Sequence, residues 1–103
     1  METALAISAC DCVMPDIARI GGVTGWLEAA TLAASREVPI SSHLYPEISL
    51  SLLAASPTAD WLEYVDWAEA FLAEPLQVVD GKVIPSAKPG NGLVWDEAKI
   101  ARL

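Results

Sequence analysis

The chain has 103 residues, of which 53% are hydrophobic, so it is long enough to form one domain with an apolar core. Fourteen acidic residues against six basic ones give a formal net charge of −8 at pH 7, which argues against binding to nucleic acid or to an anionic membrane surface. The longest stretch without a charged residue, 48–59, is far shorter than the roughly 18 residues that a membrane-spanning helix needs, so we predict no membrane span.

Two further features indicate the compartment and the packing of the protein. Cys10 and Cys12 are two residues apart, a spacing at which a disulfide is geometrically poor, and the start at Met1 lacks the basic segment of a secretory signal. We therefore expect reduced thiols in a cytoplasmic protein. The mean hydropathy of +0.38 is high for a soluble chain, which indicates strands covered on both faces or a surface that packs on something else.

The chain begins with a predicted helix over 3–9, where alanine and other helix formers are frequent. The apolar run 12–14 then predicts a short buried strand, which Pro15 ends, so that Asp16 lies at the C-terminal end of this strand.

A glycine pair, Gly21-Gly22, follows and predicts a tight turn, with close approach to a phosphate as the alternative. After it, apolar residues recur at helical spacing from Val23 to Ala34, which predicts an amphipathic helix with Trp26 packed in the core.

The middle of the chain repeats this alternation of strand and helix. The run 38–42 predicts a second strand that ends at His43, and Pro46 suits the first turn of a helix that Pro57 stops. Within that stretch 48–52 alternates like a strand, but its continuation does not, so we favour a helix. The run 61–65 predicts a third strand, which carries Glu63 and a packed Trp61. This rhythm is typical of an α/β fold with parallel strands.

The tail differs from this pattern. Asp80-Gly81 predicts a two-residue hairpin turn, prolines and glycines follow it, and Asp96 suits the N-cap of a short helix that we expect to run to Leu103. We therefore divide the chain into an alternating part, 1–67, and a C-terminal segment with a hairpin and a short helix, 68–103.

Each predicted strand delivers one titratable side chain, and in a parallel sheet the C-terminal strand ends face one side. We therefore expect Asp16, His43 and Glu63 to converge. A carboxylate that accepts a hydrogen bond from one nitrogen of His43 would fix the tautomer and leave the other nitrogen as a base, because the ordinary pKa of imidazole lies near neutrality. The apolar setting of Glu63 favours a neutral acid that donates a proton or a hydrogen bond.

Two alternatives to this catalytic interpretation remain at this point. A single histidine is often a hydrogen-bonded structural residue, and His43 is the only one in the chain. A small metal site built from Cys10, Cys12, Asp16 and His43 is the second alternative, although a Cys-x-Cys pair with one distant histidine is poor spacing for zinc.

Four runs stand in order along the chain: Val-Met-Pro-Asp at 13–16, Arg-Ile-Gly-Gly-Val-Thr-Gly-Trp at 19–26, Pro-Ile-Ser-Ser-His-Leu at 39–44 and Trp-Leu-Glu at 61–63. Together they resemble the mandelate racemase / muconate lactonizing enzyme family of the enolase superfamily. The tail from Glu74 to Trp95 also resembles the C-terminal segment of that family, so the resemblance covers nearly the whole chain.

The resemblance implies a modified TIM barrel, of which this chain is about the last three βα units, with the C-terminal segment from the capping region. It also implies a racemase or acid-sugar dehydratase that abstracts the proton alpha to the carboxylate of a 2-hydroxy acid. His43 matches the general acid/base, Asp16 its partner, and Glu63 the acid that hydrogen-bonds the substrate carboxylate. In that family a Mg²⁺ ion helps to hold the resulting enediolate.

The chain also departs from the family pattern. The resemblance implies three carboxylate ligands for Mg²⁺ and a Lys-x-Lys pair on earlier strands, and this sequence contains none of those strands. We therefore expect a C-terminal fragment that is inactive alone and that forms a homo-oligomer or assembles with a missing N-terminal part. The alternative is a truncated, non-catalytic remnant or binding module. We therefore assign no metal ligand to the residues of this chain.

Overall fold

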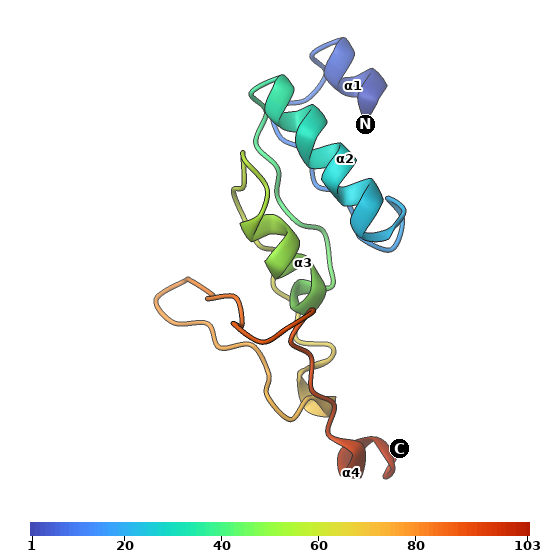
Figure 1. Ribbon diagram of the computed structural model, residues 1–103, viewed down its shortest axis with the longest axis vertical. Coiled ribbons are helices and arrows are strands. Elements are labelled where there is room, and N and C mark those ends of the chain that lie inside the picture. Colours follow the sequence, from blue (N-terminus) through green and yellow to red (C-terminus); the bar gives the residue numbers. More distant parts are fainter.

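The structure, a computed structural model, describes all of residues 1–103. Its helical elements, in chain order, are α1 (Glu2–Ala6), α2 (Gly22–Ser35), α3 (Pro46–Ala54), the short 3₁₀ helix η1 (Glu69–Phe71) and α4 (Glu97–Ile100). The molecule measures 49 × 28 × 22 Å, with α1 at one end of the long axis and α4 at the other (Figure 1). None of the helices combines the length and apolar character needed to span a bilayer.

Helix α2 confirms the amphipathic helix predicted after the glycine pair. Gly21 and Gly22 have φ values of 95° and 72°, a left-handed conformation that glycine adopts without steric strain, so the pair forms the turn into the helix. One face of α2 is then buried at helical spacing by Trp26 and by three alanines (Ala29, Ala30 and Ala33). This face holds α2 against the rest of the chain.

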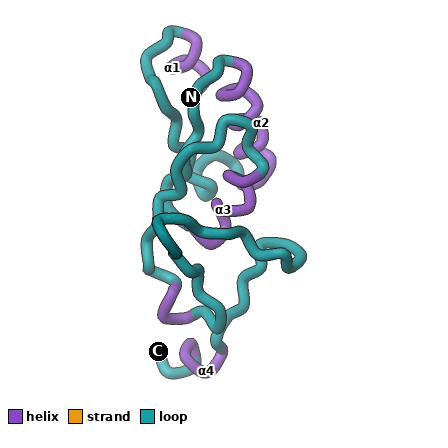
Figure 2. The backbone as a smooth tube through the Cα atoms, turned by 90° about the vertical axis from the view of Figure 1, so that its left-hand side faces the viewer, coloured by secondary structure: helices purple, strands orange, loops and turns teal.

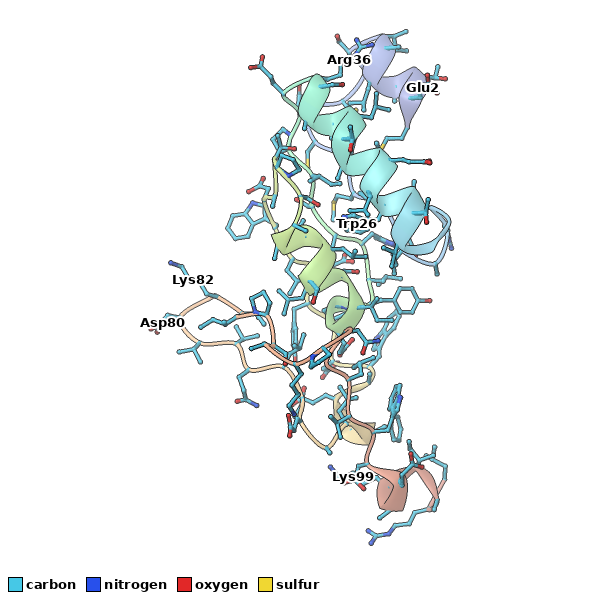
Figure 3. The ribbon with its side chains drawn as sticks, in the orientation of Figure 1. Glu2, Trp26, Arg36, Asp80, Lys82 and Lys99 are labelled. Atoms are coloured by element: carbon cyan, nitrogen blue, oxygen red, sulfur yellow. The ribbon has the colours of Figure 1, made fainter.

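Helix α3 confirms that the stretch 48–52 is helical. Pro46 occupies its first turn, where the missing N–H costs nothing, and the buried face carries Leu50 and Leu53. The indole N–H of Trp26 donates to the hydroxyl of Ser56, just beyond α3, over 3.0 Å. Figure 3 shows Trp26 reaching from α2 toward α3, so this bond joins the two helices.

The main hydrophobic cluster lies in the first sixty residues, and Leu72 is buried outside it. Only 17 of the 103 residues are buried, so most of the chain's apolar content is only partly covered. Trp26 is completely buried as predicted, whereas Trp67 and Trp95 are exposed. The core cluster consists of Leu5, Val13, Ile17, Trp26, Ala30, Ala33, Ile40 and Leu53.

Extended segments between the helices run parallel, as predicted, but they form isolated pairs and not continuous strands. The parallel pairs are Val13 with Ile40, Asp16 with His43, and Ile40 with Ala59. Accordingly, Figure 2 shows loop wherever the chain is not helical. Pro15 explains part of this difference, because proline has no N–H to give to the ladder.

The third predicted strand, 61–65, is wrong as a strand, and Trp61 does not pack in the core. β-pairing on this segment ends at Ala59, and Trp61 is 71% exposed. The physical reason is a change of partner: the N–H groups of Trp61 and Glu63 bond to the hydroxyls of Ser41 and Ser42 and not to backbone carbonyls.

The tail forms the predicted hairpin and the predicted capped helix. Val79 and Lys82 exchange two backbone hydrogen bonds of 2.9 and 3.0 Å across Asp80-Gly81, and both turn residues have positive φ. Figure 3 shows Asp80 and Lys82 at a tip that projects from the body. Asp96 accepts from the Lys99 N–H at 3.0 Å and caps α4, which ends at Ile100 and not at the predicted Leu103.

Candidate functional site

Asp16 and His43 lie side by side at the ends of neighbouring parallel segments. The His43 Nδ1 atom is 3.4 Å from the Asp16 Oδ2 atom, and the backbone N–H of His43 donates to the Pro15 carbonyl over 3.2 Å. The Asp16 side chain is 10% exposed and that of His43 is 41% exposed. The carboxylate is thus shielded, whereas the imidazole remains accessible to a ligand.

The Asp16 carboxylate is held by the turn that follows it. Its Oδ1 atom accepts from the Ala18 N–H over 2.8 Å, and its backbone carbonyl accepts from the N–H groups of Arg19 and Ile20. The exposed Arg19 guanidinium lies 3.7 Å from Oδ2. These contacts keep Oδ2 directed at His43, a fixed geometry that a free carboxylate would lack.

The arrangement determines which nitrogen of His43 is available for chemistry. Because Nδ1 faces Asp16, the carboxylate favours a proton on this nitrogen and leaves Nε2 as the base. The Nδ1 to Oδ2 distance of 3.4 Å is longer than the usual range of a hydrogen bond, so the two groups form a close electrostatic contact. The pair can therefore accept and return a proton at Nε2.

Glu63 joins this pair through the residue after His43. Its Oε2 atom accepts from the Leu44 N–H over 2.6 Å. Leu44 and Tyr45 have φ values of 56° and 47°, in the left-handed region that non-glycine residues seldom adopt. The structure thus brings Glu63 to the edge that carries Asp16 and His43, but with Oε2 accepting a hydrogen bond where we expected a donor.

The four residues of the metal-site alternative do not assemble. No group of three or more histidine, cysteine or acidic side chains in the chain is arranged to hold a metal ion. Cys10 and Cys12 are both free thiols, and the Cys12 Sγ atom lies 3.7 Å from the Ser41 hydroxyl. The structure therefore corrects the idea of a Cys-x-Cys metal site.

Sequence reasoning missed three residues of this region. Ser41 and Ser42 are 2% and 0% exposed, and their hydroxyls accept the Trp61 and Glu63 N–H groups over 3.1 and 2.9 Å. Arg19 beside Asp16 is the third. The available signal was two hydroxyl residues in succession inside an apolar run, because buried hydroxyls require hydrogen-bond partners.

Comparisons with known proteins place this chain in a family. A family model described as Enolase C-terminal domain-like matches residues 1–99. The chain is 34% identical over 90 residues to L-talarate/galactarate dehydratase from Salmonella typhimurium, a match that spans 87% of this chain and 23% of the dehydratase.

Two solved structures also match closely. An enolase from the alphaproteobacterium bal199 with bound Mg has a TM-score of 0.92 and 48% identity, over 99% of this chain and 28% of that one. An enolase from Bradyrhizobium in complex with magnesium and mandelic acid has a TM-score of 0.89 and 47% identity, over 97% of this chain and 27% of that one.

The chain spans about a quarter of the length of these relatives and matches their C-terminal part. The relatives are dehydratases and racemases of the enolase superfamily, whose structures are TIM-barrel enzymes. From the family match over residues 1–99 and the agreement in structure, this chain belongs to the enolase C-terminal domain-like family of mandelate racemase / muconate lactonizing type.

Proposed function

We propose that this chain is the proton-transfer segment of a Mg²⁺-dependent enzyme that abstracts the proton alpha to the carboxylate of a 2-hydroxy acid. The enzyme is an acid-sugar dehydratase or a mandelate racemase-like racemase. The observation that carries the proposal is the parallel pair of Asp16 and His43, with Nδ1 3.4 Å from Oδ2. The dehydratase named above, which acts on acid sugars, and the complex with mandelic acid support this substrate class.

In this proposal His43 performs the proton transfer. Its accessible Nε2 removes the α-proton, and the charge that develops on the ring is stabilised by Oδ2 of Asp16 at Nδ1. Asp16 is itself held by the Ala18 N–H, so the ring does not have to be reoriented during the reaction.

Glu63 has the second role, at the substrate carboxylate. Its Oε2 atom is engaged by the Leu44 N–H, so Oε1 is the oxygen that remains to hydrogen-bond the substrate. This contact would orient the α-carbon toward His43. Residues 1–67 supply this edge of the barrel, and residues 68–103 lie outside it.

The residues of this chain do not fit a Mg²⁺ site, because they bring together no cluster of metal-binding side chains. The ligands of the ion belong to a complementary segment, carried by the same longer polypeptide or by another chain.

The absence of a metal cluster also favours the alternative function for the chain by itself, a non-catalytic remnant or binding module. The two candidates differ in one respect. The enzyme segment must support turnover when the complementary part of a relative is supplied, and the remnant must not.

A chimera provides the test. Residues 1–103 replace the matched C-terminal part of the Salmonella typhimurium L-talarate/galactarate dehydratase, and the product is assayed for galactarate dehydration and for uptake of deuterium at the α-carbon. We expect turnover, and we expect His43→Asn in the chimera to lower it about 10²- to 10⁴-fold, because a general base is lost.

The controls separate chemistry from folding. Asp16→Asn should lower turnover as well, while Asp11→Asn, at an exposed carboxylate away from the site, should not. A chimera that melts like the parent enzyme and binds Mg²⁺ but neither dehydrates nor exchanges would refute the proposal. Deuterium uptake that survives His43→Asn unchanged would refute the assigned base.

A further inference from the structure

The pairing between the second and third extended segments shifts by one residue just before the site. The Ile40 N–H bonds to the Thr58 carbonyl and the Asp60 N–H to the Ile40 carbonyl, which is the regular parallel pattern of an Ile40–Ala59 pair. In unbroken register the Ser42 N–H would meet the Asp60 carbonyl. It bonds instead to the carbonyl of Trp61, one residue further along, over 2.9 Å.

Burial confirms this shift independently. Side chains alternate between faces along an extended segment, so a one-residue shift moves each later side chain to the other face. In unbroken register Trp61 would point with Ile40 toward the helices, and Leu62 would point with His43. The reverse holds: Trp61 is 71% exposed, and Leu62 packs against the core.

The shift has a direct consequence for the site. After it, Glu63 comes level with His43 and lies on the same face, where its carboxylate reaches the Leu44 N–H over 2.6 Å. Without it, Glu63 would point toward the helices that cover Ile40, and Leu62 would stand beside His43.

Two buried hydroxyls hold the shifted register. The shift leaves the Trp61 and Glu63 N–H groups without the carbonyl partners of a regular ladder. The Ser41 Oγ atom accepts the first over 3.1 Å and the Ser42 Oγ atom accepts the second over 2.9 Å. Neither donor is then left without an acceptor, which would be unfavourable for an amide that is shielded from water.

We propose that Ser41 and Ser42 are positioning residues whose hydroxyls hold this one-residue shift and so place Glu63 on the face and at the level of His43. The catalytic meaning of that placement rests on the proposed function, but the placement itself does not. Neither serine hydroxyl is hydrogen-bonded to the imidazole, and the serines act by fixing where the Glu63 carboxylate lies.

Hydrogen–deuterium exchange of the full chain without substrate tests the placement of Glu63. Exchange is measured by mass spectrometry at residue resolution, a method that works for a monomer or an oligomer. In Ser42→Ala we expect the amides of Glu63 and Leu44 to exchange about tenfold faster, after correction for any general change in α2. Leu44 is the decisive amide, because its partner is the Glu63 carboxylate and not a serine.

Matched variants keep the test decisive. Ser56→Ala removes another buried serine hydroxyl, whose partners are Trp26 and Leu52, and should leave Leu44 at its corrected wild-type rate. Ser42→Thr retains a hydroxyl and should protect Leu44 as in the wild type. Ser41→Ala, the second variant if Ser42→Ala unfolds the chain, should speed exchange at Trp61 and Leu44.

The outcomes separate this inference from the proposed function. Two results would overturn the positioning role even if the chimera is active. The first is that the corrected exchange rate of the Leu44 amide is unchanged in both Ser42→Ala and Ser41→Ala. The second is that this rate is no faster in these variants than in Ser56→Ala. If the Leu44 amide exchanges selectively faster and the chimera is inactive, the placement of Glu63 is supported and only the proposed enzyme function is rejected.

Discussion

Replacing Gly25 by alanine should destabilise the chain, although this substitution inside a helix ordinarily stabilises it. Gly25 lies in the first turns of α2, against the loop that leads from Asp16. A Cβ atom at this position would lie 1.7 Å from the Ile20 carbonyl oxygen and 2.6 Å from its carbon. These are backbone atoms, so no side-chain rotation can relieve the contact.

The magnitude follows from two opposed terms. Alanine gains about 1 kcal/mol over glycine in a helix interior. Overpacking a well-packed site costs typically about 1–3 kcal/mol, and a contact this short belongs at the upper end of that range. We therefore expect a net loss of about 2 kcal/mol in the free energy of unfolding, from a change that propensity alone would predict to be favourable.

The assay is urea unfolding followed by far-ultraviolet circular dichroism, at concentrations low enough to keep the chain monomeric. Thr24→Ala, at an exposed position of the same turn, is the matched control and should change stability by no more than about 0.5 kcal/mol. In the chimera, Gly25→Ala should also lower turnover. The alanine Cβ would displace the backbone of Ile20, and because the Ile20 N–H bonds to the Asp16 carbonyl, Asp16 would move as well. Stabilisation by Gly25→Ala would refute the packing argument.

Three further predictions concern the rest of the chain. Trp26→Phe leaves the Ser56 hydroxyl without the indole donor and should lower the free energy of unfolding by about 1 kcal/mol beyond the effect of the lost buried area. Urea unfolding of this variant, of Ser56→Ala and of the double variant measures the effect. Partial burial, and then the hydrogen bond to Glu69, raise the pKa of the Tyr64 phenol above 10.0. The stability that protonated Tyr64 contributes is present below the ordinary tyrosine pKa and is lost as pH rises through the raised value. Ultraviolet titration should show that Glu69→Gln lowers the pKa of Tyr64. Finally, the chain alone should oligomerise or bind a hydrophobic dye, because several large apolar side chains are exposed; a monodisperse, sharply melting monomer in sedimentation and calorimetry would contradict this.

Local patterns were sufficient to predict helices α2 and α3 and the hairpin. The glycine pair before α2, Pro46 at the start of α3 and Asp80-Gly81 in the tail act through the backbone geometry of a few neighbouring residues, so a single sequence contains the needed information. The parallel order of the extended segments also followed, and with it the meeting of Asp16 and His43.

The third segment could not be predicted in this way, because its conformation depends on partners about twenty residues away. Its apolar run predicted a strand, and only the hydroxyls of Ser41 and Ser42 show why the ladder stops and the register shifts. The wrong expectation for Trp61 has the same origin: the shift turns this side chain outward and Leu62 inward. The local hydrophobic pattern does not indicate from which distant N–H group a serine hydroxyl will accept a hydrogen bond.

Asp16 orients His43 so that Nε2 is the free base. Because His43 is the only histidine, the ¹⁵N NMR signals of its ring in the neutral state report this orientation directly in the chain itself. We expect the wild-type ring to carry its proton on Nδ1, and we expect Asp16→Ala to lose this preference while Asp11→Ala keeps it. A wild-type ring protonated on Nε2, and unchanged by Asp16→Ala, would show that Asp16 does not orient the base.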